Sequence, residues 1–186
     1  MKISLLSKAL LIFWLSLLAN SLVAQDAVNQ CATSEIKKHF KTKKDVLRKN
    51  ENGESGWVWM VKNCATVDNL KYFLKMGPNI NEVDADGNNA LFHISNLTSN
   101  QAALARMSDM AATMDDPMRV QVLETAKEIT FKDAAEMCSI LLKKKINAKN
   151  KNAAGITAYG NLINNAQVDP YYNYLLEPFA TYGVTE

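Results

Sequence analysis

The sequence predicts an all-α protein, with an N-terminal cap helix followed by a helical solenoid of three to four helix-turn-helix repeats. Three observations predict this fold class. Apolar residues at helical spacing recur every 34 residues, and glycines recur with the same period. The composition, 48% hydrophobic and 22% charged, is that of a folded domain. A pair of short helices cannot bury its apolar face alone, so stacked pairs are expected to share one core.

Residues 1–24 have the pattern of a cleavable export signal. Lys2 and Lys8 give a positive start, residues 10–18 are apolar, and Ala24 ends a short cleavage-like sequence. The apolar run is short for a membrane span, which leaves an uncleaved anchor as the alternative interpretation. We therefore expect a periplasmic or secreted protein with no membrane span after cleavage.

Residues 25–50 are expected to form the N-terminal cap segment. An amphipathic helix over residues 34–49 would place Ile36, Phe40, Val46 and Leu47 on one side and lysines on the other. Terminal units of a stacked array need one solvated face, and the lysine-rich side suits that role. Contact of this basic face with an acidic partner or with lipid headgroups is the alternative.

The second helix of each repeat is predicted from an apolar triplet. Leu70, Phe73 and Leu74 have the i, i+3, i+4 spacing of one helix face. The equivalent residues at intervals of 34 are Leu104, Met107 and Ser108, then Cys138, Leu141 and Leu142, and finally Tyr172, Leu175 and Leu176. Ser108 is the one polar residue among these twelve positions.

The first helix of each repeat follows a recurring glycine. Gly53, Gly87 and Gly155 keep the 34-residue period, and each precedes a small residue and then a bulky one. A third unit would have glycine at position 121 but has Gln121, so residues 120–129 would form its first helix in a shifted register. Two interpretations stay open: four repeats, which the 68-residue spacing favours, or three repeats with a helical insertion near 97–130.

Within residues 51–186, two stretches resemble the ankyrin-repeat family. Residues 70–95 and 138–163 contain its leucine-rich second helix, its turn and its hairpin start, as in 77–81, 84–91 and 154–158. The chain departs from the family pattern at Phe92, which replaces a histidine that appears one place later, and at the glycine-free turn after Leu142. Residues 97–135 are the degenerate or inserted unit.

The resemblance implies that a partner protein binds at the hairpin tips and on the inner face of the first helices. Trp59, His93 and Asn161 occupy equivalent positions and are expected on that inner face. Packing of Trp59 against the cap helix is the alternative. One hairpin tip carries Asp84 and Asp86, and another carries Lys149 and Lys151. These seven residues are the candidate partner-binding set.

Three cysteines follow the predicted signal. Cys64 aligns with the turn inside the first repeat, and Cys31 precedes the cap helix that should pack on that repeat. We therefore predict a Cys31–Cys64 disulfide, consistent with an oxidising compartment. Cys138 occupies a core position and is expected to be a buried free thiol.

Charge and motifs exclude several functions. Without Lys2 and Lys8 the chain carries 19 basic and 19 acidic residues, which argues against a nucleic-acid binder. The two histidines, His39 and His93, lack metal-spaced partners, and nucleotide-binding and hydrolase motifs are absent from the sequence. We expect no catalytic residue, metal or cofactor.

The sequence therefore favours an exported, non-catalytic protein that binds another protein, as a monomer or in a heterocomplex. An immunity or inhibitor protein for a periplasmic toxin or enzyme is one such role. An assembly or trafficking factor for an exported haem enzyme is the alternative, with Met107, Met110, Met114 and Met118 as adaptable surface. A small-molecule or enzymatic function within residues 97–135 is the contrasting class.

Overall fold

The computed structural model describes residues 31–96 and 116–185. These stretches contain eight α-helices, one 3-10 helix and no β-strand, which confirms the all-α fold class. The predicted signal at 1–24 lies outside the described residues. In chain order the helices are α2 (Thr33–His39), α3 (Lys43–Leu47), α4 (Gly56–Asn63), α5 (Val67–Lys75), α6 (Ala90–Ser95), α8 (Asp116–Lys143), α9 (Ala158–Ala166), η2 (Pro170–Tyr172) and α10 (Asn173–Thr181).

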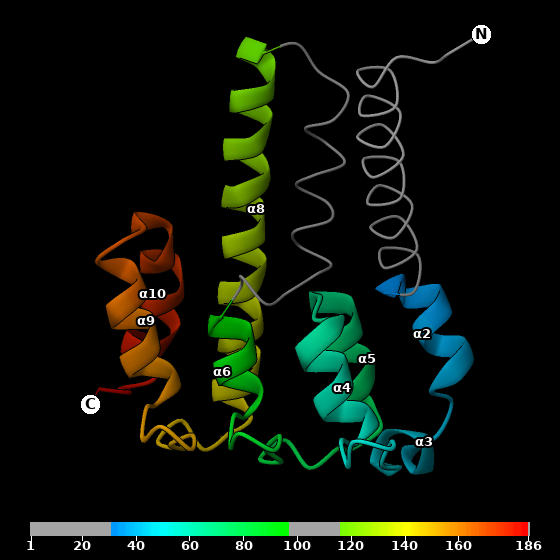
Figure 1. Cartoon of the computed structure of the whole chain (residues 1–186). Helices are drawn as coiled ribbons and strands as arrows, with labels where there is room; N and C mark the ends of the chain where they lie inside the picture. Colours follow the sequence, from blue (N-terminus) through cyan, green and yellow to red (C-terminus); the bar gives the residue numbers. More distant parts are fainter. Residues whose placement is uncertain (1–30, 97–115, 186) are drawn as a thin grey trace, which may run out of the picture.

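Most of these helices form two rows that lie side by side (Figure 1). In the first row α4 packs on α6 and α6 packs on α9, while in the second row α5 packs on α8 and α8 packs on α10. Each first-row helix also packs on the second-row helix of its own pair: α4 on α5, α6 on α8 and α9 on α10. The core between the rows includes Trp57, Phe73, Leu91, Leu141, Leu162, Leu175 and Phe179, each fully buried.

Three hairpins lie along one edge of the rows (Figure 1). We name them hairpin 1 (residues 49–55), hairpin 2 (residues 83–89) and hairpin 3 (residues 151–157). Each has a glycine in the left-handed region, with φ of 75°, 77° and 76° in turn, where a residue with a Cβ is disfavoured. The residues that fill this role are Gly53, Gly87 and Gly155.

The hairpins share one hydrogen-bond pattern. Asn50, Asp84 and Asn152 each accept two backbone N–H groups on a side-chain oxygen, at 2.8–3.1 Å. The residue that ends each hairpin then caps the next helix, because its side-chain oxygen accepts the N–H three residues later. These caps are Ser55, Asn89 and Thr157.

Hairpins 2 and 3 are direct neighbours. The N–H of Ala153 donates to the carbonyl of Asp86 at 2.8 Å, and Asn150 Nδ2 donates to the carbonyl of Gly87 at 2.8 Å. Because α6 also packs directly on α9, no further helix pair lies between them. The described residues form three helix pairs, and the second pair contains the insertion. The four-repeat interpretation, which the 68-residue spacing favoured, is wrong.

The long helix α8 combines two roles. Near its end, Cys138 and Leu141 are fully buried in the second pair, as Leu70 and Phe73 are in the first. Its earlier turns rise beyond the first-row helices (Figure 1) and pack beside η2 and α10. Residues 120–129, expected to be a separate first helix, are therefore part of α8. The matches at 104, 107 and 108 lie outside the described residues.

The turn after α8 keeps its geometry without a glycine. Lys145 has a φ of 62°, close to the 69° of Gly77, which stands 68 residues earlier. In the same turns, the side chains of Asn79 and Asn147 each accept the N–H two residues on, at 3.2 Å. A lysine therefore occupies the strained position that glycine holds in the first pair.

The cap segment contains two short helices rather than the single helix expected over 34–49. Thr42 restarts the chain as the N-cap of α3, in a capping box with Asp45. Ile36 and Val46 are buried as expected, but Leu47 is 42% exposed. The cap approaches α4 at Gly56, where an added Cβ would lie 2.5 Å from Phe40.

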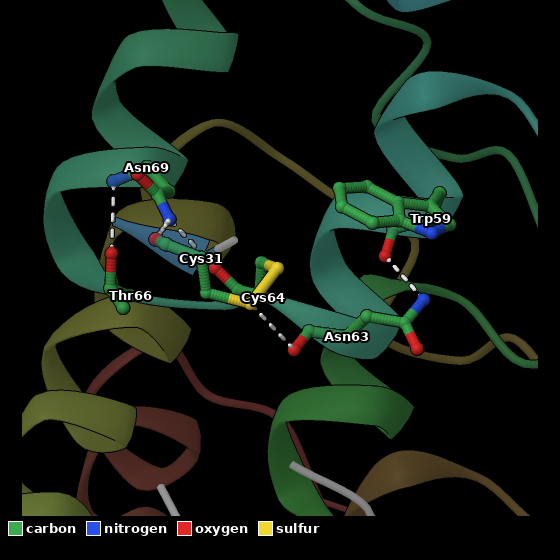
Figure 2. The surroundings of a disulfide bond; sticks show 6 residues. All are labelled: Cys31, Trp59, Asn63, Cys64, Thr66 and Asn69. Atoms are coloured by element: carbon green, nitrogen blue, oxygen red, sulfur yellow. Dashed lines mark hydrogen bonds between the residues drawn. A yellow bond between two sulfur atoms is a disulfide. The ribbon is translucent and has the colours of Figure 1, made fainter. Parts of the chain in front are cut away.

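The predicted Cys31–Cys64 disulfide is confirmed and joins the cap to the first helix pair (Figure 2). Buried Asn69 reinforces this junction, because its Nδ2 donates to the carbonyls of Cys31 and Cys64 at 3.0 and 2.9 Å. Cys138 is a buried free thiol, as predicted, and burial raises its pKa to about 12. It is therefore an unreactive thiol at neutral pH.

Candidate functional site

The hairpin edge and the adjoining surface of α4 and α6 hold a cluster of charged side chains. Lys62 Nζ lies 2.8 Å from Glu54 Oε1. This carboxylate holds the pKa of Lys62 above its usual value, and Asp84 and Asp86 add to the effect. The four side chains come from α4, hairpin 1 and hairpin 2. The first two pairs are therefore linked electrostatically at this edge.

His93 and Asp84 form the buried part of this cluster. Nε2 of His93 lies 3.1 Å from Oδ2 of Asp84, and the side chains are 8% and 3% exposed. The approach is poorly aligned for a hydrogen bond, since Nε2 has no well-oriented partner among the described residues. Burial lowers the pKa of His93, although Asp84 opposes this shift. The described structure therefore holds His93 as a neutral side chain at neutral pH.

Hairpins 1 and 2 are joined by Glu82. Its carboxylate accepts a hydrogen bond from Ser55 Oγ at 2.8 Å and lies 3.7 Å from Lys49 Nζ. Together with the bonds between hairpins 2 and 3, this contact connects the three hairpins into one continuous row. The row presents a preorganised surface, because the same bonds fix each hairpin against its neighbour.

The seven predicted partner-binding residues fall into three environments. Asp84 and His93 are buried against each other, and Asp84 also serves hairpin 2 as its turn residue. Asp86, Lys149 and Lys151 are exposed along the hairpin row. Asn161 and Trp59 are partly buried in α9 and α4. The Nδ2 of Asn161 is buried without a hydrogen-bond partner among the described residues.

Trp59 packs against the cap, which was the alternative weighed for it. Its ring stacks on Phe40, with centroids 5.9 Å apart and planes at 28°. Between α3 and α4 lies a cleft of about 220 Å³ lined by both rings. We call it the cap cleft; its lining also includes Asp45, Arg48, Lys49, Asn50, Glu54, Ser55 and Gly56.

A second groove, of about 500 Å³, lies between α8 and α10. Tyr171 and Tyr174 stack there with ring centroids 6.2 Å apart; Lys127 Nζ lies over the Tyr171 ring and Lys132 Nζ over the Tyr174 ring. The Tyr171 hydroxyl donates to Glu124, which raises the pKa of Tyr171 to about 12. Tyr171 and Tyr174 therefore attach η2 and α10 to α8.

The sequence did not lead us to expect Glu54, Lys62 or Phe40 at this edge. The repeat alignment places Glu54 beside the hairpin glycine, where the other units have Asn88 and Ile156. A charged residue at this position of the repeat differs from the uncharged residues of the other units, and this difference could have indicated Glu54 from the sequence. The contact of Phe40 with Trp59 was not detectable, because it depends on the break between α2 and α3.

Within residues 31–96 and 116–185, no group of three or more His, Cys, Asp or Glu side chains is arranged to hold a metal ion. In the same residues, no helix combines the length and apolarity that a membrane span requires. A scan against models of protein families gives no match, and a search of curated proteins finds no relative.

Proposed function

We propose that this chain is an exported, non-catalytic protein-binding module built from three divergent ankyrin-type repeats. The observation that carries the proposal is the row of three hairpins with the same turn geometry and cap pattern, connected side by side. Such a row offers a rigid edge to a partner. The export pattern of residues 1–24 and the Cys31–Cys64 disulfide support an extracytoplasmic location.

Charge along the edge would orient the partner. Asp86 is exposed on hairpin 2, whereas Lys149 and Lys151 are exposed in and beside hairpin 3. Opposite charges at neighbouring tips favour one docking direction and raise the association rate. The preformed hairpins reduce the ordering cost of binding.

Within this class we favour an inhibitor or immunity protein for a periplasmic toxin or enzyme, because a rigid, preorganised edge suits tight binding. An assembly or trafficking factor for an exported haem enzyme is the second candidate. Of the four methionines that suggested it, those at 107, 110 and 114 lie outside the described residues, and Met118 lies in α8. Loss of the partner's activity in a stoichiometric complex supports inhibition, whereas a transient complex with raised activity supports assembly.

The test is affinity capture of the full chain, carrying a C-terminal tag, from the envelope of its native host. We expect one dominant partner, and intact mass should show a chain that begins at Gln25. Lys149→Glu with Lys151→Glu should abolish capture by reversing the charge of hairpin 3.

The matched control is Lys71→Glu with Lys132→Glu, which reverses two exposed charges on the second-row helices. Both lysines form exposed ion pairs, which contribute little to stability, so this variant should fold and retain the partner. Capture that survives in the hairpin variant, or is lost equally in both, contradicts binding at the hairpin row.

A further inference from the structure

The cap cleft is a recess between the cap segment and α4. Its apolar lining is the stacked pair of Phe40 and Trp59, and Trp59 stays partly exposed there. Phe40 can approach α4 this closely because position 56 is glycine, whereas the equivalent positions have Ala90 and Ala158. The disulfide at Cys31 holds the cap, and so the cleft, in place.

The acidic residues that line the cleft already form hydrogen bonds or ion pairs within the chain. Asp45 Oδ2 accepts the N–H groups of Lys41 and Thr42 at 3.1 and 2.9 Å, and the Thr42 hydroxyl at 2.9 Å. These bonds lower the pKa of Asp45, so it stays ionised. Glu54 pairs with Lys62. Both carboxylates are therefore satisfied without a ligand.

The basic residues that line the cleft have fewer interactions with neighbouring side chains than the acidic residues have. Arg48 is exposed and forms no ion pair within 4 Å among the described residues, although its charge adds to the lowering of the Asp45 pKa. Lys49 is 65% exposed and lies 3.7 Å from Glu82, a loose contact. Residues 35–49 also carry seven lysine or arginine side chains and two carboxylates, which makes the surroundings positive.

We propose that the cap cleft receives an acidic side chain of the partner protein, together with an adjoining apolar side chain. This inference rests on the proposed function and specifies the partner's chemistry. The carboxylate would bind Arg48 and Lys49, and Arg48 offers the planar fork that suits carboxylates. The apolar side chain would lie on Trp59 and Phe40, since partly exposed tryptophans are frequent anchors in interfaces.

The size and shape of the cleft favour a peptide over other anionic ligands. Its volume of about 220 Å³ is below the roughly 300–1,000 Å³ of small-molecule sites and fits one or two side chains. A membrane surface would need a broader apolar face, and Leu47 is the one large hydrophobic residue of the described cap that is strongly exposed.

The test is an NMR titration of the full secreted chain with the blocked dipeptide acetyl-Leu-Glu-amide. We expect a saturable shift of the Trp59 indole N–H resonance, with the buried Trp57 indole as an internal reference. Acetyl-Leu-Gln-amide, which lacks the charge, should bind about tenfold more weakly. Arg48→Gln with Lys49→Gln should weaken binding of the acidic dipeptide to the same extent.

The charge-matched control is Lys143→Gln with Lys144→Gln, which removes two exposed charges at the end of α8, outside the cleft. It should bind like the unaltered chain. No shift at Trp59, equal binding of the two dipeptides, or equal losses in both variants would overturn the proposal. Binding to anionic lipid vesicles without any response to the dipeptide would overturn it as well.

The dipeptide titration and the partner capture can fail independently, so the cleft proposal and the proposed function are tested separately. If a partner is captured at the hairpin row but the dipeptide does not bind, the cleft proposal fails and the binding module stands. If the dipeptide binds but no partner is captured, the cleft recognises acidic peptides and the proposed function fails.

Discussion

At the scale of single residues, the buried pair of His93 and Asp84 connects protonation to stability. Burial depresses the pKa of His93 in the folded chain, so the unfolded chain takes up a proton more readily. Stability is then fully present above the unfolded pKa of about 6.5 and falls as the pH decreases through the folded pKa.

We predict that the free energy of unfolding falls below about pH 6.5 by up to about 1.4 kcal/mol per pH unit from this residue. Urea titrations at several pH values measure the slope. His93→Gln should remove this contribution, and His39→Gln, at an exposed position, should not. An identical slope in the His93 variant and the unaltered chain would contradict the assignment.

Gly56 illustrates how a single position fixes the cap. We predict that Gly56→Ala destabilises the chain by about 1–3 kcal/mol, because the added Cβ meets Phe40 at 2.5 Å. The same alanine is tolerated at positions 90 and 158. In the background of Phe40→Ala the penalty should shrink but not vanish, because the same Cβ also lies 3.0 Å from the carbonyl oxygen of Asp45; a double-mutant cycle in urea measures the difference. Additive effects of the two substitutions would show that the contact does not exist.

At the scale of elements, the contact between hairpins 2 and 3 explains why three helix pairs form one body. Gly87 and Gly155 have φ values of 77° and 76°, so alanine is strained equally at both. Beyond that strain, a Cβ at Gly87 would lie 3.2 Å from Asn152, whereas nothing lies within 4 Å of one at Gly155.

We therefore predict that Gly87→Ala costs more stability than Gly155→Ala, by roughly 1 kcal/mol or more. Thermal unfolding of the two variants in parallel measures the difference. Equal losses would place hairpin 3 away from hairpin 2 and undermine the three-pair arrangement.

The elements differ in how far the sequence determined them. The hairpins and helix starts were predictable, because glycine, asparagine and cap residues act locally, as at Gly87 and Asn89. The number of repeats was not. The second helix pair contains an insertion about as long as one 34-residue repeat, so the spacing of the glycines on either side matches that of an additional repeat. The apolar pattern of α8 also continues through part of this insertion. The break in the cap depends on the Thr42 capping box, which competed with the amphipathic pattern of residues 34–49.

The sequence predicted where the candidate site residues lie in the repeats, but it did not predict which of their side chains are exposed to solvent. The repeat register placed Trp59, His93 and Asn161 at equivalent points of the first helices. It did not reveal that Asp84 turns inward to His93 or that Phe40 reaches Trp59, since the repeat spacing does not determine the direction of either side chain.

At the scale of the whole molecule, the disulfide determines whether the cap belongs to the fold. The bond joins residues separated by 33 positions, and closing such a loop is worth about 4 kcal/mol in the chain-entropy description. We predict that Cys31→Ser with Cys64→Ser lowers the free energy of unfolding by about this amount, measured by urea denaturation. Cys138→Ser leaves the bond intact and serves as the control for general cysteine effects.

The same bond predicts the thiol content of the purified chain. Without reductant, the denatured protein should show one reactive thiol, from Cys138, and the native protein should show none, because that thiol is buried. Three reactive thiols after denaturation would mean that the disulfide does not form in the native compartment.

We propose above that a partner protein docks on the hairpin row. Lysine cross-linking followed by mass spectrometry, applied to the complex captured from the envelope, tests it most directly. We expect cross-links to the partner to concentrate at Lys49, Lys149 and Lys151 along the row. Cross-links that concentrate instead at Lys71 and Lys132, on the second-row helices, would contradict it.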